Sequence, residues 1–244
     1  MLHNLKHLAL SRNDRVRRMQ CSKCRQEAIH YQPYSGQYLC REHLVADIES
    51  KAKRMIRQQK GMCPGDHIAV ILTGDPAQRA LFFFLHNLAG KRRDIRVSGI
   101  VVDGHESPGS VAVQADATRI ASGITLEDCS AAILAGILRG EPMSGILGRG
   151  EDTGTLPVIA PFCHIPSCEI ALYSRIHGLG ERGIPATREI DPLYEDVKKL
   201  LGEFASRHPA APHAILNLGE MLSDAVQETD AEQGTHRTVD EETR

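Results

Sequence analysis

The sequence predicts an α/β fold with a parallel sheet and a small metal-binding module near its N-terminal end. Apolar runs typical of buried strands alternate with helical patterns between residues 67 and 225, the order of elements that gives a parallel sheet covered by helices. Ahead of them lie three cysteines and a histidine at metal-ligand spacing. A chain of 244 residues is long enough for both parts.

The candidate metal ligands are Cys21, Cys24, Cys40 and His43, spaced as Cys-x2-Cys-x15-Cys-x2-His. Two close pairs separated by a loop suit a tetrahedral zinc ion, and a set in which protein fills all four positions leaves no place for water. We therefore predict a structural zinc site, which would also stabilise a segment too small to fold alone. The alternative is a chance placement of free thiols.

The composition argues against a globally basic nucleic-acid-binding protein, a membrane-spanning protein and a disulfide-rich protein. The net charge of −2 gives no global signal for nucleic acid, so any basic surface must be local. No apolar run is long enough to span a membrane, and residues 1–18 lack the apolar block of a signal peptide. The seven cysteines, an odd count, fit a reducing compartment better than a disulfide framework. We expect a cytoplasmic protein without a membrane partner.

Apolar spacing and the Gly and Pro turns predict the order of elements. Helices are expected at 44–60, 77–89, 126–140, 167–177, 192–207 and 213–225, and strands at 67–72, 96–103, 118–123 and 157–162. In the helix at 126–140, we expect the core face to be Ile133, Leu134, Ile137 and Leu138.

Four segments follow from this order. Residues 1–20 are an extension, either disordered or not translated, and residues 21–60 hold the zinc module and a basic helix. Residues 61–226 form the α/β domain, and residues 227–244 are an acidic tail that we expect to be disordered.

The basic helix carries its apolar residues on one face and its cations elsewhere. Next to a zinc module, such a helix is a candidate for contact with RNA phosphates, and the alternative is a solvated polar face. The cations in question are Lys51, Lys53, Arg54 and Arg57.

The turn after the first sheet strand lies where α/β proteins bind phosphate. Here it reads LTGDPAQ, from residue 72 to residue 78. Thr73 and Gly74 suit an anion site, whereas the Asp75 carboxylate would repel a phosphate and Pro76 has no backbone N–H to donate. These residues alone predict a poor phosphate site.

Three segments, and a fourth stretch near the C-terminal end, resemble the PP-loop ATPases that thiolate tRNA, in particular the two-thiouridine synthetase type. The Cys/His motif, with its Cys40-Arg41-Glu42-His43 ending, is similar to the LIM-like zinc module of that family. AVILTGDPAQRAL at 69–81 is similar to its strand and Ser-Gly-Gly-x-Asp-Ser loop, and ASGITLEDCSAAILAGILRGE at 121–141 to its Gly-His-Asn-x-Asp-Asp helix. The stretch 161–178 is similar to its C-terminal pattern.

The nucleotide loop departs from the family pattern. Asp75, Ala77 and Gln78 replace its second Gly, its Asp and its Ser. The positions that keep part of the nucleotide-binding character are Thr73, Gly74 and Gly123. Glu127 and Asp128 roughly keep the acidic pair of the later motif. With Asp103 they are candidates for a magnesium site at the carboxyl edge of the sheet, and the alternative for Glu127 and Asp128 is favourable charge at a helix start.

The cysteines that carry the sulfur chemistry of the family have no counterpart at the matched positions. The Cys-x-x-Cys pair is missing, and Asp191-Pro192 stands where the third cysteine would be. Cys129, Cys163 and Cys168 are an alternative thiolate set, although burial of small side chains is the simpler interpretation. We therefore expect no iron–sulfur cluster and assign no catalytic residue.

The resemblance implies a Rossmann-like parallel sheet and a setting of tRNA, ATP and Mg²⁺. The departures favour a divergent member in which the signature loop and the catalytic cysteines are degenerate and ATP/Mg²⁺ binding is doubtful. One hypothesis is an enzyme that still binds adenine nucleotide weakly. The alternative is a non-catalytic pseudoenzyme that binds tRNA or an active paralogue, and a homodimer is compatible with either.

Overall fold

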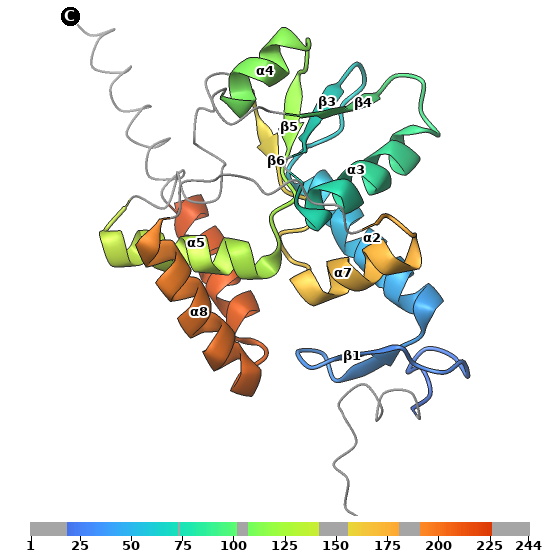
Figure 1. Ribbon diagram of the computed structural model, residues 1–244, viewed down its shortest axis with the longest axis vertical. Helices are drawn as coiled ribbons and strands as arrows, with labels where there is room; N and C mark the ends of the chain where they lie inside the picture. The colour runs from blue at the N-terminus through green and yellow to red at the C-terminus, as the bar shows by residue number, and fades with distance from the viewer. Residues whose placement is uncertain (1–18, 73, 102–106, 142–155, 181–190, 226–244) are drawn as a thin grey trace, which may run out of the picture. The chain divides into compact units, whose positions relative to one another are not determined.

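The computed structural model describes residues 19–72, 74–101, 107–141, 156–180 and 191–225 (Figure 1). The chain divides into two compact units within helix α2 (Arg41–Gln58): the first ends at Ile48 and the second begins at Glu49. The expected disordered tail and most of the expected N-terminal extension lie outside the described residues.

The first unit is built on a β-hairpin followed by the start of α2. β1 (His30–Gln32) pairs antiparallel with β2 (Gln37–Leu39), and the rings of Tyr31 and Tyr38, which face each other across the pair, have centroids 4.6 Å apart. The turn needs Gly36, whose φ of +69° is left-handed. Two residues after β2, α2 begins, so the hairpin places Cys40 directly before a helix.

The apolar stripe predicted for α2 is buried along its whole length. Leu44, Ile48 and Ala52 have no exposed surface, and Met55 is 1% exposed. Spacings of three and four residues put these side chains on one face of the helix.

The second unit contains a four-stranded sheet in the order β4-β3-β5-β6, with every neighbouring pair parallel. The strands are β3 (His67–Ile71), β4 (Arg96–Ile100), β5 (Arg119–Ala121) and β6 (Val158–Ile159). All five residues of β3 are buried, which accounts for its unbroken apolar run. The predicted α/β class with a parallel sheet is confirmed.

Helices pack on both faces of this sheet. α4 (Pro108–Gln114) places Ala112 in a core cluster with Ala69 and Ile71 of β3. Gly99 of β4 lies against Phe82 of α3 (Pro76–Ala89), and its register partner is Val70. Because neighbouring strand residues point to opposite faces, α3 and α4 lie on opposite sides. The sequence did not predict α4.

The remaining helices are α5 (Leu126–Arg139), α7 (Ser167–Ile176), α8 (Pro192–Arg207) and residues 211–225. α5 packs on α8, and α7 packs on α3. None of the described helices is long and apolar enough to cross a membrane.

The core face expected for α5 is partly wrong. Ile133 is fully buried, but Ile137 is 42% exposed and Leu138 61% exposed. Smaller residues of α5 are buried instead, with Ala131 and Ala135 packed against Val197 of α8. Close helix packing favours such small side chains, and the longer apolar ones at the end of α5 face outward.

A close backbone contact joins the loop after β5 to the first turn of α3, the helix that follows β3. A Cβ atom built on Gly123 would lie 2.9 Å from the backbone N and 3.0 Å from the Cα of Gln78. Parallel strands end at the same edge of the sheet, so both segments lie at its carboxyl edge. Gly123 is required here by lack of space.

We predict that Gly123→Ala lowers the free energy of unfolding by about 1–3 kcal/mol, because the methyl group forces two backbone segments apart. Urea denaturation of the purified chain measures the change. Gly202→Ala in α8 is the matched control: its Cβ would meet nothing within 4 Å, so gained helix propensity should stabilise the chain by up to about 1 kcal/mol. Equal effects of the two substitutions would contradict the contact.

Candidate metal centre and the loop after β3

The structure brings together the four predicted metal ligands. The Sγ atoms of Cys24 and Cys40 are 3.7 Å apart, and Nδ1 of His43 lies 3.2 Å from Sγ of Cys40 and 3.5 Å from Sγ of Cys21. Bonds of about 2.3 Å to sulfur and 2.0 Å to nitrogen at tetrahedral angles place ligand atoms about 3.5–3.8 Å apart. The set therefore fits one tetrahedral ion such as zinc.

Backbone N–H groups donate to the sulfur atoms of two of the cysteines. Backbone N–H groups of Lys23 and Gln26 donate to the sulfurs of Cys21 and Cys24, both at 3.5 Å. Burial raises the pKa of Cys21, but donation from the amides of Cys40 and Lys23 outweighs it and holds this pKa at about 6. Donation from the Gln26 amide lowers the pKa of Cys24, but burial and the neighbouring Cys40 and Cys21 outweigh it and raise this pKa. Cys21 is therefore the first of the two to reach the thiolate form that binds metals.

The other cysteines do not form a comparable group. Within the described residues, the only His, Cys, Asp and Glu side chains that gather in a group of three or more with ligand atoms within 4.8 Å of one another are the four above. Cys129 and Cys163 are buried in the apolar cluster that includes Met55 and Ile133. Cys168 is exposed at the start of α7.

Cys168 is a weakly acidic thiol despite its exposure. Partial burial of the sulfur, then the negative charges of Glu169 and Glu127, raise its pKa to about 11. This thiol is therefore protonated at neutral pH.

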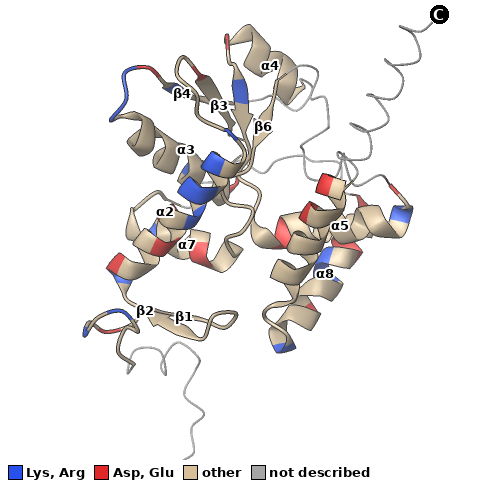
Figure 2. Cartoon of the chain, turned by 180° about the vertical axis from the view of Figure 1, so that it is seen from behind, with Lys and Arg blue, Asp and Glu red and all other residues tan. Residues whose placement is uncertain are grey.

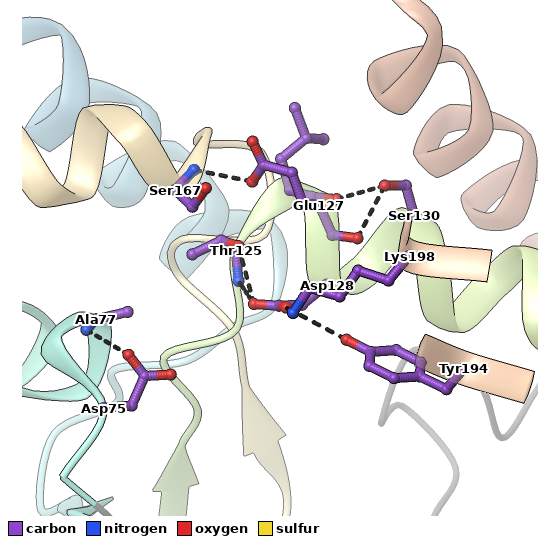
Figure 3. Close-up of polar contacts among 10 residues, drawn as sticks. Asp75, Ala77, Thr125, Glu127, Asp128, Ser130, Ser167, Tyr194 and Lys198 are labelled. Carbon is purple, nitrogen blue, oxygen red and sulfur yellow. Dashed lines mark hydrogen bonds and ion pairs between the residues drawn. The ribbon is translucent and has the colours of Figure 1, made fainter. Parts of the chain in front are cut away.

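At the end of the loop after β3, the side chain of Asp75 occupies a backbone N–H at the start of α3 (Figure 3). Asp75 is the N-cap of α3, and its Oδ1 accepts from the backbone N–H of Ala77 at 2.8 Å. Gly74 before it has φ +91°, a conformation suited to glycine. Thr73 lies outside the described residues. A phosphate at this helix start would meet a carboxylate and would have to compete for the Ala77 N–H.

The start of α5 is likewise closed by its own residues (Figure 3). Oδ2 of Asp128 accepts from the backbone N–H and the hydroxyl of Thr125, at 3.1 and 2.9 Å, in a capping box. Its Oδ1 accepts from Nζ of Lys198 at 2.7 Å and from the hydroxyl of Tyr194 at 3.2 Å. Despite burial, these donors and the Lys198 charge lower the pKa of Asp128.

The neighbouring acid, Glu127, caps a different helix. Its Oε2 accepts from the backbone N–H of Ser167, the first residue of α7, at 2.8 Å (Figure 3). Both members of the acidic pair therefore accept from a backbone N–H at a helix start, Asp128 at that of its own helix and Glu127 at that of α7. Asp103 lies outside the described residues.

The four cations proposed for RNA contact differ in their surroundings. Nζ of Lys51 lies 3.9 Å from the buried carboxylate of Glu169, and Nζ of Lys53 donates to Glu49 at 2.9 Å. Arg54 and Arg57 are exposed. A surface that attracts phosphate would therefore depend more on the two arginines.

Comparison with known proteins begins at the metal centre. The family model of the N-terminal LIM domain of the 2-thiouridine synthetase TtuA matches residues 20–45, which include all four ligands. The tRNA 2-thiolation protein NcsA of Haloferax volcanii is 40% identical over 48 residues, which make up 20% of this chain and 15% of that protein. The N-terminal module is therefore similar to the LIM domain of TtuA, and a 48-residue stretch of the chain is similar to NcsA.

The likeness extends to the fold. The structure of the U34-tRNA thiolase NcsA from Methanococcus maripaludis, with its [4Fe-4S] cluster, matches 84% of this chain and 88% of that one with a TM-score of 0.71. Sequence identity over this match is 15%. The predicted resemblance is thus confirmed by the N-terminal module and the fold together.

The expectation of no iron–sulfur cluster is wrong as an inference from the sequence, because a solved structure of this fold carries a [4Fe-4S] cluster. The inference assumed that motif alignment identifies equivalent cysteine positions. At 15% identity, insertions and deletions shift such positions, and a thiolate can reach a cluster from a different segment.

One feature was missed at the sequence level. Residues 91–96 read KRRDIR, four cations in six residues, and these four are exposed. The run of cations is visible in the sequence, but the residues that lie next to it in the folded chain are not.

We predict that the purified chain holds about one zinc ion and that Cys40→Ser removes it, because three ligands cannot replace a closed tetrahedral set. Elemental analysis after dialysis measures the metal. Cys63→Ser is the control, since Cys63 is an exposed thiol outside the group. Equal zinc content in both variants would argue against the site.

Proposed function

We propose that the chain is a divergent tRNA-thiolation-type protein that binds tRNA and has lost tight nucleotide binding at the loop after β3. The observation that carries the second part is the Asp75 carboxylate, which occupies the N–H of Ala77 at the start of α3. Tight binding of a nucleotide phosphate at such a site relies on open backbone N–H groups and the positive end of the helix dipole.

The likeness to TtuA and NcsA supports the first part. Both names describe thiolation, and the two NcsA proteins act on tRNA by their descriptions. The exposed Arg54 and Arg57 on α2 supply a locally basic surface that suits phosphates. Lys51 and Lys53 contribute charge to the same helix.

The alternative is a pseudoenzyme that binds tRNA or an active paralogue without turnover. The capping roles of Glu127 and Asp128 favour it, because these carboxylates are engaged in holding α7 and α5. Analysis of tRNA for a thiolated product after incubation with ATP and a sulfur source separates the two hypotheses: product favours the enzyme, and its absence favours the pseudoenzyme.

We predict no saturable binding of Mg²⁺–ATP below about 1 mM, which corresponds to about −4 kcal/mol. Removing the charge of Asp75 while keeping a cap, as in Asp75→Asn, should tighten ATP binding about fivefold, because one like charge near a phosphate costs about 1 kcal/mol. Isothermal titration calorimetry measures both.

The control for this substitution is Asp191→Asn. Asp191 caps α8 in the same manner: a proline follows it, and its carboxylate accepts from the N–H of Leu193. It lies at the start of a different helix. Micromolar affinity in the unaltered chain, or equal ATP affinity in the two variants and the unaltered chain, would contradict the role given to Asp75.

We predict that a tRNA gel shift weakens about three- to tenfold in the Arg54→Gln/Arg57→Gln variant, since each lost phosphate contact reduces the electrostatic part of binding. Lys199→Gln/Arg207→Gln on α8 removes the same charge from exposed positions and serves as control. An unchanged shift in the first variant would reject α2 as an RNA contact.

A further inference from the structure

We propose that the amino edge of the sheet is a second surface for RNA phosphates, at the opposite edge from the loop after β3. This inference rests on the proposed function, because the ligand of the surface is the tRNA. We call it the amino-edge band, and its members are Lys60, Lys91, Arg92, Arg93, Arg96 and Arg119.

The placement of the band follows from the parallel sheet. Residues 91–96 lead into β4, Arg119 is the first residue of β5, and residues 59–66 lead from α2 into β3. The starts of parallel strands share one edge, whereas the loops after β3 and β5 share the other. Figure 2 shows blue and red stretches in the segment before β4, whose sequence is KRRDIR from residue 91 to residue 96.

Hydrogen bonds join the segments of the band. The N–H of Gly65 donates to the carbonyl of Asp94 at 2.8 Å, and the N–H of Arg96 donates to the carbonyl of Asp66 at 2.9 Å. On the other side, Nε of Arg119 donates to Oδ2 of Asp66 at 2.8 Å. A surface fixed in this way loses little conformational freedom on binding.

The charge of the band is strongly one-sided. Five of its members are exposed, and Arg119 is largely used to neutralise Asp66, which is 9% exposed. The exposed acids beside them are Asp94, which is paired with Arg92 through Nε at 3.0 Å, and Asp116. Among the described residues, no ion pair engages Lys60, Lys91 or Arg93. A net positive field therefore remains at this edge, in a chain whose overall charge is −2.

The lack of apolar surface favours a polyphosphate over an acidic protein. In the described part of the chain, none of the large hydrophobic side chains that are exposed belongs to residues 58–66 or 91–96. Protein interfaces centre on buried apolar or aromatic anchors, whereas nucleic-acid backbones are held by cations without such anchors. The band has the second composition.

The test measures the binding of tRNA to the full chain by fluorescence anisotropy, over a series of salt concentrations. In Lys91→Gln/Arg93→Gln, we expect about three- to tenfold weaker binding and a salt slope reduced by about 1.5–2, one contact for each charge removed. Both side chains are exposed, so thermal unfolding should be unchanged. The control is again Lys199→Gln/Arg207→Gln, which should bind as the unaltered chain does.

Three results would overturn the inference, and they separate it from the proposed function. If Lys91→Gln/Arg93→Gln binds tRNA like the control while Arg54→Gln/Arg57→Gln does not, the band is no RNA contact and the proposed function stands. If the unaltered chain binds no tRNA, both proposals fail. If the band variant loses affinity for polyglutamate but keeps its affinity for tRNA, the band serves an acidic protein.

Discussion

The burial of β3 is the constraint on which the rest of the second unit depends. This strand pairs with β4 on one side and β5 on the other, and helices cover both of its faces. A strand without a free edge or a solvated face cannot slip by one residue without placing its apolar side chains on the wrong side. Its fixed register sets where α3 begins and where the segment before β4 lies.

Acidic side chains close several helix starts at or near the carboxyl edge of this sheet. Asp75 caps α3, Asp128 caps α5, and Glu127 of α5 accepts from the first N–H of α7. Each contact satisfies a donor that the helix itself cannot satisfy. The same donors are the groups that hold phosphate in related architectures, so local stability and anion binding compete for them.

Local patterns predicted most helices and strands of the second unit, though not α4, and grouped the four candidate metal ligands, because both depend on spacing along the chain. The stripe from Leu44 to Met55 and the short-spaced Cys/His pairs need no knowledge of distant residues. The outward face of Ile137 and Leu138 depends on how closely α8 approaches α5, which apolar periodicity does not encode.

Two features of the candidate surfaces also depend on distant parts of the chain. The engagement of Lys51 depends on Glu169, which is 118 positions away in sequence and belongs to α7. The run at 91–96 acquires its setting from hydrogen bonds to residues 65 and 66. The erroneous exclusion of an iron–sulfur cluster has a similar origin, since equivalence of cysteines across relatives is a property of three-dimensional position.

The thiol of Cys168 has a practical consequence for handling the protein. Alkylating reagents and peroxide attack the ionised form of sulfur, and this side chain ionises only near pH 11. Although water reaches it, it should survive aerobic purification and react slowly with maleimides at pH 7. Partial burial of the sulfur, together with the carboxylates beside it, thus lowers the reactivity of a cysteine that water can reach.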